Sequence, residues 1–203
     1  MSKERQLRKQ EETKEIILNT ARDIIAEDGF QSLSIRKITK KIDYSPGIVY
    51  HYFKDKNEII EILVSEGYKK IIASASNFKR DEDNPEKEIK EVFVNYIKSA
   101  LESPDIYLAF MLNDESSIIK KTRLLKRGIT EESKTIQILS EKIERGINKG
   151  KFKAWNIELT AQIIWTSIFG LLIKIIIEKD VSEKQIEELI QHNFEIIFKG
   201  IMN

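Results

Sequence analysis

The sequence predicts an all-α fold, with an N-terminal three-helix domain that contains a helix-turn-helix and a larger C-terminal helical domain. Three observations support this. Apolar residues recur at spacings of three and four through most of the 203 residues, alternating strand patterns are absent, and each of the three prolines suits a helix start or a loop. The chain is long enough for one large domain or two small ones.

The composition limits the chemistry. No cysteine is present, which excludes disulfides, thiol catalysis and cysteine-bound metals, and His51 and His192 are too few for a histidine-rich metal site. We therefore expect neither a metal nor another cofactor. The N-terminal residues are charged and contain no apolar signal region, so we expect a cytoplasmic protein.

The first helix is expected from Thr13 to Asp28, where Gly29 suits a helix stop. Residues 1–12 are polar and charged, and we expect a flexible arm there. Residues 13–60 form the predicted N-terminal domain, within which residues 34–53 form the helix-turn-helix.

The turn of this motif has suitable residues at each position. Ser34 can cap the first of its helices, and Ser45 can cap the second, where Pro46 suits the first position. Asp43 lies where the chain must turn sharply, and Asp tolerates a left-handed conformation better than most residues. Gly47 lets the backbone approach a phosphate group closely, as a helix N-terminus favours.

The second helix of the motif is predicted to have an inner and an outer face. Val49 and Phe53 are four residues apart and should pack inward, which leaves Tyr50 and His51 facing outward. Residues 34–56 contain six Lys or Arg residues against two Asp residues, whereas the whole chain has a net charge of only +1. A local excess of positive charge next to exposed hydroxyl and ring groups is typical of a DNA-binding surface.

Residues 13–60 resemble the DNA-binding domain of TetR-family transcriptional regulators. The resemblance rests on Gly29-Phe30, Ser34-Ile35-Arg36, Ile38, the run from Ser45 to Phe53, and Lys56. Two positions depart from the family pattern: Asp43 stands where Gly is usual, and Thr39 where Ala is usual. The resemblance implies that DNA is contacted by Arg36, Ser45, Pro46, Gly47, Tyr50, His51, Tyr52 and Lys56.

Residues 61–203 form the predicted C-terminal domain. We expect its helices to follow a long helix from Lys56 to Phe78, with a boundary loop at residues 80–84 and an irregular region at residues 104–128. The remaining helices are predicted from Pro85 to Ser103 after an Asn84 cap, from Thr130 to Gly150, from Asn156 to Lys179, and from Ser182, which with Gln185 makes a capping box.

The predicted helix at 157–178 is apolar on more than one face, so it must be buried on more than one side. A membrane span is one alternative, because about 20 apolar residues are enough. Glu158, Gln162 and Lys174 interrupt this stretch, and we favour burial against the chain's own core and a second subunit. The family resemblance implies a homodimer formed by the last two helices, for which the predicted interface residues are Ile168, Leu172, Ile176, Ile190, Phe194 and Phe198.

The resemblance also implies a pocket for a small-molecule effector in the C-terminal domain. Aromatic and other large apolar residues there suit an apolar or aromatic effector, although such residues are more often ordinary core. The predicted pocket residues are Phe93, Tyr96, Tyr107, Phe110, Met111, Trp165 and Phe169, with Asn95 and Gln162 as possible polar anchors.

These features favour a ligand-responsive transcriptional repressor that binds a near-palindromic operator in double-stranded DNA as a dimer. An enzyme is not expected, because the sequence has no glycine-rich phosphate loop, metal-ligand cluster or nucleophile–base pair. Two alternatives stay open: a helical adaptor protein with a degenerate helix-turn-helix, and a transcriptional activator of the same fold. DNA binding separates the adaptor from the regulators.

Overall fold

The computed structural model describes residues 3–75, 81–111 and 123–203. The chain divides into two compact units, Met1–Tyr68 and Lys69–Asn203. All named elements of the described residues are helical, and the β-type pairing among them is an isolated bridge between Phe152 and Met202. The predicted all-α class is therefore confirmed.

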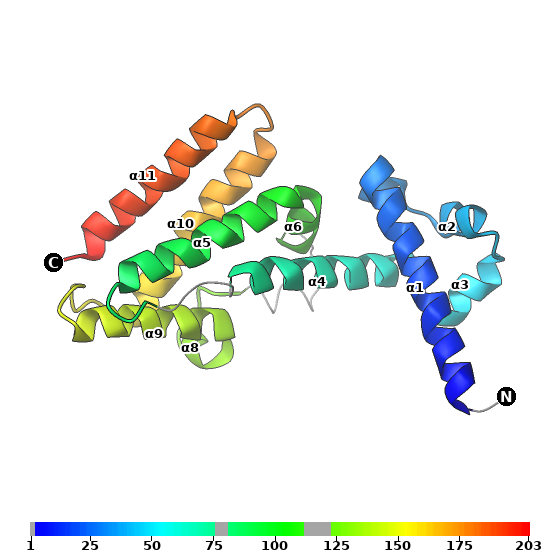
Figure 1. The fold of residues 1–203 in the computed structure, drawn as a ribbon, viewed down its shortest axis with the longest axis horizontal. Helices are drawn as coiled ribbons and strands as arrows, with labels where there is room; N and C mark the ends of the chain where they lie inside the picture. The colour runs from blue at the N-terminus through cyan, green and yellow to red at the C-terminus, as the bar shows by residue number, and fades with distance from the viewer. Residues whose placement is uncertain (1–2, 76–80, 112–122) are drawn as a thin grey trace. The chain divides into compact units, whose positions relative to one another are not determined.

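The first unit contains a long helix, a short 3₁₀ turn and a helix-turn-helix (Figure 1). Its elements are α1 (Lys3–Asp28), η1 (Phe30–Ser32), α2 (Ile35–Ile42), α3 (Pro46–Tyr52) and the first part of α4 (Lys56–Ala75). Helix α1 ends where the sequence predicts, because Gly29 takes a φ of 80° that an L side chain rarely adopts.

The start of α1 differs from the prediction. The helix begins at Lys3 rather than at Thr13, so residues 3–12 are helical and not a flexible arm. Those residues are Lys, Glu, Arg, Gln and Leu, all of which have high helix propensity. The side chains from Glu4 to Lys9 are exposed. Because this part of the helix buries no apolar face, the sequence has no apolar periodicity that would predict it.

The core of the first unit brings α1, α2, α3 and α4 together. Ile17, Ala21, Ile38, Val49 and Ile59 are completely buried. Partly buried residues packed around them include Ile25, Ile35, Ile42, Tyr52 and Ile60. The inward positions predicted for Ile38, Val49 and Phe53 are confirmed, and this core holds the two short helices of the motif against α1.

The second unit is built from longer helices. They are α5 (Pro85–Glu102), α6 (Pro104–Met111), α8 (Ile129–Glu132), α9 (Lys134–Asn148), α10 (Ile157–Ile177) and α11 (Glu183–Ile201), together with the last residues of α4. Helix α10 packs against α9, α11 and α5, and α5 also contacts α9, α11 and α6. Figure 1 shows α10 and α11 as a neighbouring pair joined by a short loop.

Several predicted helix ends are confirmed and others are wrong. Asn156 and Ser182 cap α10 and α11 by accepting hydrogen bonds from the backbone N–H groups of Leu159 (2.9 Å) and Gln185 (3.3 Å). Asn84 precedes Pro85 as expected but does not cap α5. Its side-chain amide donates instead to the carboxylate of Asp81, at 3.1 Å.

The helix predicted from Thr130 to Gly150 is two helices. The first turn is the short α8, and Ser133 then interrupts it and caps α9 through the N–H of Ile136. Helix α6 begins within the region predicted to be irregular. The predicted helix end at Phe78, the start of the boundary loop at Arg80, and residues 112–122 lie outside the described residues.

Helix α10 packs one of its faces into the core of the second unit. Among the described residues, it is the helix whose length and apolar composition would allow it to cross a membrane. One face, however, is buried within the unit, and Gln162 on that face donates to the carbonyls of Leu124 (2.8 Å) and Lys126 (3.0 Å). The role of Gln162 is therefore structural, and its possible role as an anchor in the effector pocket is not supported.

Candidate nucleic-acid interface

The turn between α2 and α3 has the geometry that its residues predict. Ser34 accepts a hydrogen bond from the N–H of Lys37 at 3.2 Å and so caps α2. Asp43 ends that helix in the left-handed conformation, with φ 55° and ψ 42°. The next residue, Tyr44, donates its N–H to the carbonyl of Thr39 at 3.1 Å. This turn fixes the direction in which α3 leaves α2.

Thr39 has a local hydrogen bond. Thr39 is buried, and its hydroxyl donates to the carbonyl of Arg36 at 3.1 Å. The hydroxyl is thus satisfied within α2, and this departure from the family pattern leaves no buried polar group without a partner.

Helix α3 presents part of the predicted contact set to solvent. The Tyr50 side chain is 56% exposed, and His51 is also exposed. Ser45, Pro46 and Gly47 at the start of the helix are exposed as well, and so is Ile48, which sequence reasoning did not include. Ser45 does not cap α3 through its side chain, which corrects that prediction.

Tyr52 is placed differently from the other predicted contacts. It is partly buried against the core of the first unit, and the ring of His51 meets it edge-on, with the ring centroids 5.0 Å apart. Because Tyr52 packs on the core, its ring supports α3 and orients His51. The outward set on α3 is therefore centred on Tyr50 and His51.

The basic residues around α3 fall into two groups. Lys37 and Lys41 are paired with Asp28 (3.2 Å) and Glu27 (2.9 Å) on α1, and the hydrogen bond to Glu27 raises the pKa of Lys41. Four others are exposed and form no ion pair within the described part of the chain: Arg36, Lys40, Lys54 and Lys56. Their charge is therefore not neutralised by these residues, as phosphate binding requires.

The start of α4 holds Lys54 and Lys56 in place. Asp55 accepts hydrogen bonds from the N–H groups of Asn57 (2.8 Å) and Glu58 (3.0 Å), as a capping residue does. Glu58 accepts from the N–H of Lys54 at 2.6 Å, one residue before the position expected in a capping box. These hydrogen bonds hold the backbone on both sides of Asp55 and so fix the positions of Lys54 and Lys56.

A second candidate site is a cavity in the second unit. It has a volume of about 210 Å³ and lies between α4, α5, α9 and α10. Three predicted residues, Phe93, Tyr96 and Trp165, line it, and the Trp165 ring centroid lies 5.4 Å from that of Phe93 and 5.2 Å from that of Tyr96. The other lining residues are Ile72, Ala75, Ile89, Val92, Thr135, Ile138, Leu139 and Lys142.

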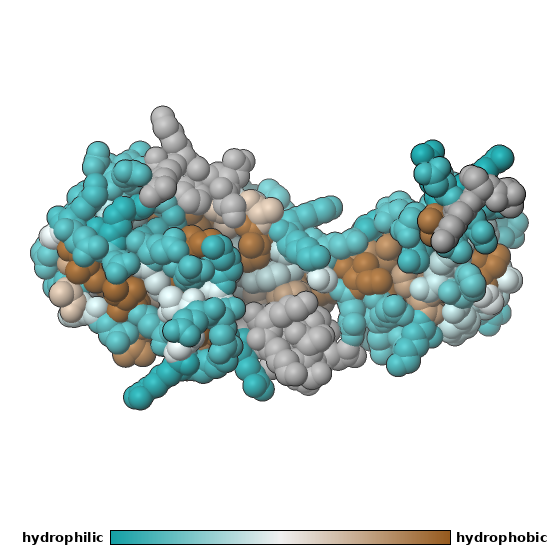
Figure 2. Space-filling model, turned by 90° about the horizontal axis from the view of Figure 1, so that it is seen from below, coloured by the Kyte–Doolittle hydropathy of each residue, from teal (hydrophilic) through white to brown (hydrophobic). Residues whose placement is uncertain are grey.

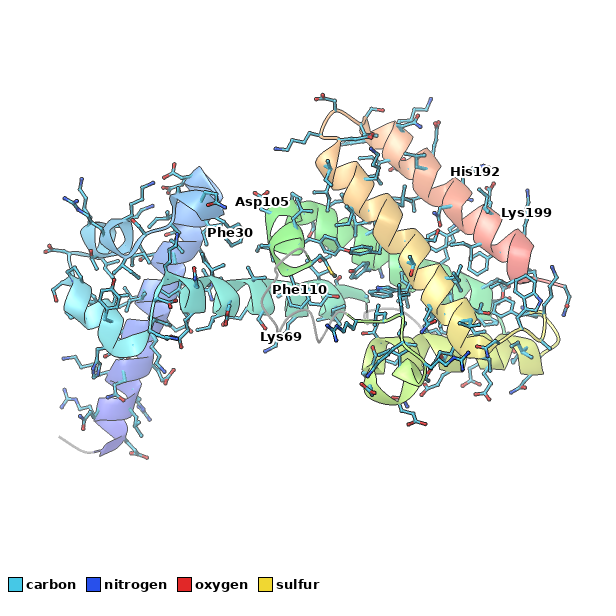
Figure 3. All side chains as sticks on the ribbon, turned by 180° about the vertical axis from the view of Figure 1, so that it is seen from behind. Phe30, Lys69, Asp105, Phe110, His192 and Lys199 are labelled. Atoms are coloured by element: carbon cyan, nitrogen blue, oxygen red, sulfur yellow. The ribbon has the colours of Figure 1, made fainter. Side chains whose placement is uncertain are left out.

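The remaining predicted pocket residues do not line this cavity. Tyr107 is completely buried, and its hydroxyl lies 3.1 Å from that of Tyr96. Phe110, labelled on α6 in Figure 3, is also buried, while Met111 and Phe169 are partly buried. Sequence reasoning missed Lys142, although its spacing of seven and four residues from Thr135 and Ile138 on α9 places all three on one helix face.

The predicted dimer residues are mostly core residues of the single chain. Ile168, Leu172, Ile176 and Phe194 are buried by other parts of the second unit, and Ile190 and Phe198 are partly buried. The exposed apolar residues on the same helices are Leu159, Ile163, Ile177, Leu189 and Ile196. The predicted interface residues thus lie mainly on the inner faces of α10 and α11, because an apolar run does not show which side the protomer buries.

Leu159, Ile163 and Ile196 border a groove of about 490 Å³ between α10 and α11. Ile163 is 68% exposed and Ile196 is 61% exposed. Beside them, Ser167 on α10 and Asn193 on α11 are hydrogen-bonded to each other at 3.0 Å.

On the face of the molecule seen in Figure 2, hydrophilic residues predominate and hydrophobic residues form smaller patches.

The first unit thus has the fold and the outward basic surface of a helix-turn-helix protein. Residues 17–63 match the family described as "Bacterial regulatory proteins, tetR family". A relative from Escherichia coli (strain K12), the HTH-type transcriptional regulator UidR, is 38% identical over 61 residues, which cover 30% of this chain and 31% of the relative. The chain therefore matches about a third of the length of that relative.

Two further comparisons extend over most of the chain. The fatty acid metabolism regulator protein of Bacillus subtilis (strain 168) is 23% identical over 154 residues, which cover 75% of this chain and 77% of the relative. The crystal structure of RolR with its ligand resorcinol has the same fold, with a TM-score of 0.59, 15% identity, and coverage of 96% of this chain and 90% of RolR.

Residues 17–63 therefore form a DNA-binding domain of the type found in the TetR family of bacterial regulatory proteins. The relatives named above are regulators rather than enzymes, which agrees with the prediction that this protein is not an enzyme.

Proposed function

We propose that this protein is a cytoplasmic, ligand-responsive transcriptional repressor that binds a near-palindromic operator as a homodimer. The observation that carries the proposal is the outer surface of the helix-turn-helix. Tyr50 and His51 are exposed on α3. The same unit also exposes four basic residues without an ion-pair partner in the described ranges: Arg36, Lys40, Lys54 and Lys56. Exposed rings next to unneutralised cations suit a groove edged by phosphates.

DNA contacts are assigned on that surface. Arg36 and Lys56 suit phosphates, and Tyr50 and His51 suit a phosphate or a base edge. Ser45, Pro46 and Gly47 form the exposed entry to α3, where the backbone can approach the DNA. Tyr52 acts mainly by packing, because it is partly buried against the core.

A dimer is proposed through the groove between α10 and α11. Five large apolar residues are exposed on these two helices, which a second copy of the pair would cover. A dimer also explains why a near-palindromic site is expected, since two copies of α3 about 34–36 Å apart read successive major grooves.

An effector site is proposed in the cavity lined by Phe93, Tyr96 and Trp165. Its walls are mainly aromatic and aliphatic, which favours a small apolar or aromatic molecule. If effector and operator oppose each other, each weakens the binding of the other by the same factor.

The experiment that tests this function is selection of bound sequences from random double-stranded DNA by the purified protein at moderate salt. We expect enrichment of a near-palindrome with half-sites about one helical turn apart. A single half-site would contradict the dimer. Failure to enrich any sequence, with the fold verified by circular dichroism, would contradict operator binding and favour the helical adaptor.

A further inference from the structure

A buried group of charged residues lies at the wall of the cavity. Lys142 on α9 is only 7% exposed and is one of the residues that line the cavity. It forms an ion pair with Oε1 of Glu88 on α5, whose side chain is almost completely buried. Arg145, three residues further along α9, pairs with Oε2 of the same carboxylate.

Lys142 gives the cavity a distinct chemistry. The other polar groups on its lining are neutral: the hydroxyls of Tyr96 and Thr135 and the indole N–H of Trp165. Neither Asp nor Glu is among the lining residues that belong to the described ranges 3–75, 81–111 and 123–203. A cation in apolar surroundings interacts with an anion much more strongly than it does in water, so the cavity favours a ligand that brings a negative charge to Lys142.

The second cation allows Lys142 to change partner. Removing the only partner of a buried carboxylate strongly destabilises the folded protein. Glu88, however, has a second ion-pair partner in Arg145. The Nε atom of Arg145 is buried and has no hydrogen-bond partner among the described residues. A guanidinium can hold a carboxylate with two parallel N–H groups. Glu88 can therefore stay neutralised by Arg145 while Lys142 binds another anion.

The size of the cavity limits the ligand. An apolar cavity of about 150 Å³ holds benzene, and this cavity has a volume of about 210 Å³. One ring or a short branched alkyl group with a carboxylate fills such a space. A longer chain or a fused ring system requires the walls to move.

We propose that the effector is a small apolar carboxylic acid, aromatic or aliphatic, whose carboxylate pairs with Lys142. This inference rests on the proposed function and specifies the chemical class of its effector. The carboxylate of the acid replaces that of Glu88 as the partner of Lys142. Binding therefore breaks one of the two ion pairs between α5 and α9, and the ion pair between Glu88 and Arg145 remains.

Binding can be followed through Trp165, which lies in the cavity wall. The other tryptophan, Trp155, is more than half exposed, so a Trp155→Phe background leaves Trp165 as the reporter. The probes are one-ring acids, each paired with its neutral amide, such as 3-phenylpropionate with 3-phenylpropanamide and cyclohexylacetate with its amide. Calorimetry on the unchanged protein checks the fluorescence result.

We expect each acid to bind about tenfold more tightly than its amide, because the neutral amide has no negative charge to pair with the ammonium of Lys142. In Lys142→Met the preference should fall to about twofold or less, since only the neutral lining remains. Lys149→Met is the matched control, because Lys149 is an exposed lysine at the end of the same helix and should keep the full preference.

Three results would overturn the inference: equal binding of acid and amide, a preference that survives in Lys142→Met, or no binding of any probe. The proposed repressor function is tested separately by operator binding without ligand. Lys142→Met should retain operator affinity, because Lys142 lies in the second unit and outside the DNA-binding surface. If the unchanged protein does not bind an operator, the proposed repressor function is contradicted but the proposed acid-binding site is not.

Discussion

At the scale of single residues, the proposed DNA-binding surface depends on which cations have ion-pair partners. The sequence of residues 34–56 shows an excess of Lys and Arg but does not show that Lys37 and Lys41 pair with Asp28 and Glu27 on α1. Those acids are 9 and 14 residues away in the chain. The effective positive charge is therefore smaller and more localised than the count of basic residues suggests.

Replacing Lys56 with Ala should weaken operator binding at all sequences and reduce its dependence on salt. Each lost phosphate contact lowers the slope of log K against log salt by about 0.9, so a dimer should lose about twice that. The measurement is a titration of labelled operator at several salt concentrations. The control is Lys179→Ala, which changes an exposed lysine just after the C-terminus of α10 in the second unit and should leave the slope unchanged.

Tyr50 is tested in the same titration. Tyr50→Phe removes only the hydroxyl and should lower affinity by about 2- to 10-fold per contact, the effect of one hydrogen bond. Tyr50→Ala should lower it further, because the ring is lost as well. Neither change should unfold the domain, since Tyr50 is largely exposed. If affinity and salt slope are unchanged in the Tyr50 and Lys56 variants, the assigned interface is wrong.

The predicted cap at Asn84 failed for a physical reason. Ser34, Asn156 and Ser182 cap helices as predicted, but Asn84 does not. Asp81 lies three residues away, and its carboxylate accepts hydrogen bonds from the side-chain amide and the backbone N–H of Asn84. Local sequence shows which residue is able to cap a helix. It does not show which of two nearby polar partners it prefers.

At the scale of elements, the first unit followed from the sequence more closely than the second. Helices α2 and α3 lie within one residue of their predicted limits, since serine, proline and aspartate mark nearly every end. In the second unit, the break at Ser133 separates α8 from α9. The sequence did not predict this break, because the contacts that hold α8 come from α10.

Glu158 provides those contacts. It lies in the first turn of α10 and accepts hydrogen bonds from the N–H of Gly128 (3.1 Å) and from the N–H (3.1 Å) and hydroxyl (3.0 Å) of Thr130. These bonds satisfy free N–H groups at the start of α8. The hydrogen bond from the backbone of Thr130 is the largest cause that lowers the pKa of Glu158 below its ordinary value.

The lowered pKa predicts how stability changes with pH. Because the folded state holds Glu158 ionised more strongly than the unfolded state does, its contribution is present above the ordinary pKa and is lost as pH falls through the lower folded value. Glu158→Gln should therefore lower the free energy of unfolding at pH 7, and the difference from the unchanged protein should shrink below about pH 4.5.

Urea unfolding at a series of pH values measures this difference. Glu131→Gln, an exposed carboxylate in α8, is the control and should show a much smaller difference at neutral pH. A Glu158→Gln effect that is constant from neutral to acidic pH would show that the carboxylate charge does not hold α8 to α10.

At the scale of the whole molecule, the second unit buries one face of α10 and leaves a second apolar face exposed. Leu159, Ile163 and Ile177 recur on that face at the spacing of a helical stripe, and Ile196 and Leu189 lie on α11. His192 and Lys199, labelled on α11 in Figure 3, are exposed residues of the same helix. The apolar residues around this helix led to the prediction of a second subunit, but only the packing distinguishes the inner face of the helix from the outer one.

The outer face makes a definite prediction about assembly. Ile163→Glu should convert a dimer into a monomer, because each interface of a two-fold dimer contains the substitution twice. Losing the burial of two isoleucines weakens association by about 3–6 kcal/mol, before the penalty of burying two carboxylates is included. Leu125→Glu is the matched control, since Leu125 is 72% exposed and lies outside α10 and α11.

Sedimentation velocity at micromolar protein gives the mass of each variant, and circular dichroism checks that the helices remain. We expect dimers for the unchanged protein and for Leu125→Glu, and a folded monomer for Ile163→Glu. That monomer should bind a single half-site weakly and lose the tight binding of the full operator, because only a dimer holds two copies of α3 on one DNA. A dimeric Ile163→Glu would place the interface elsewhere, and a monomeric unchanged protein would leave the exposed stripe without its proposed partner.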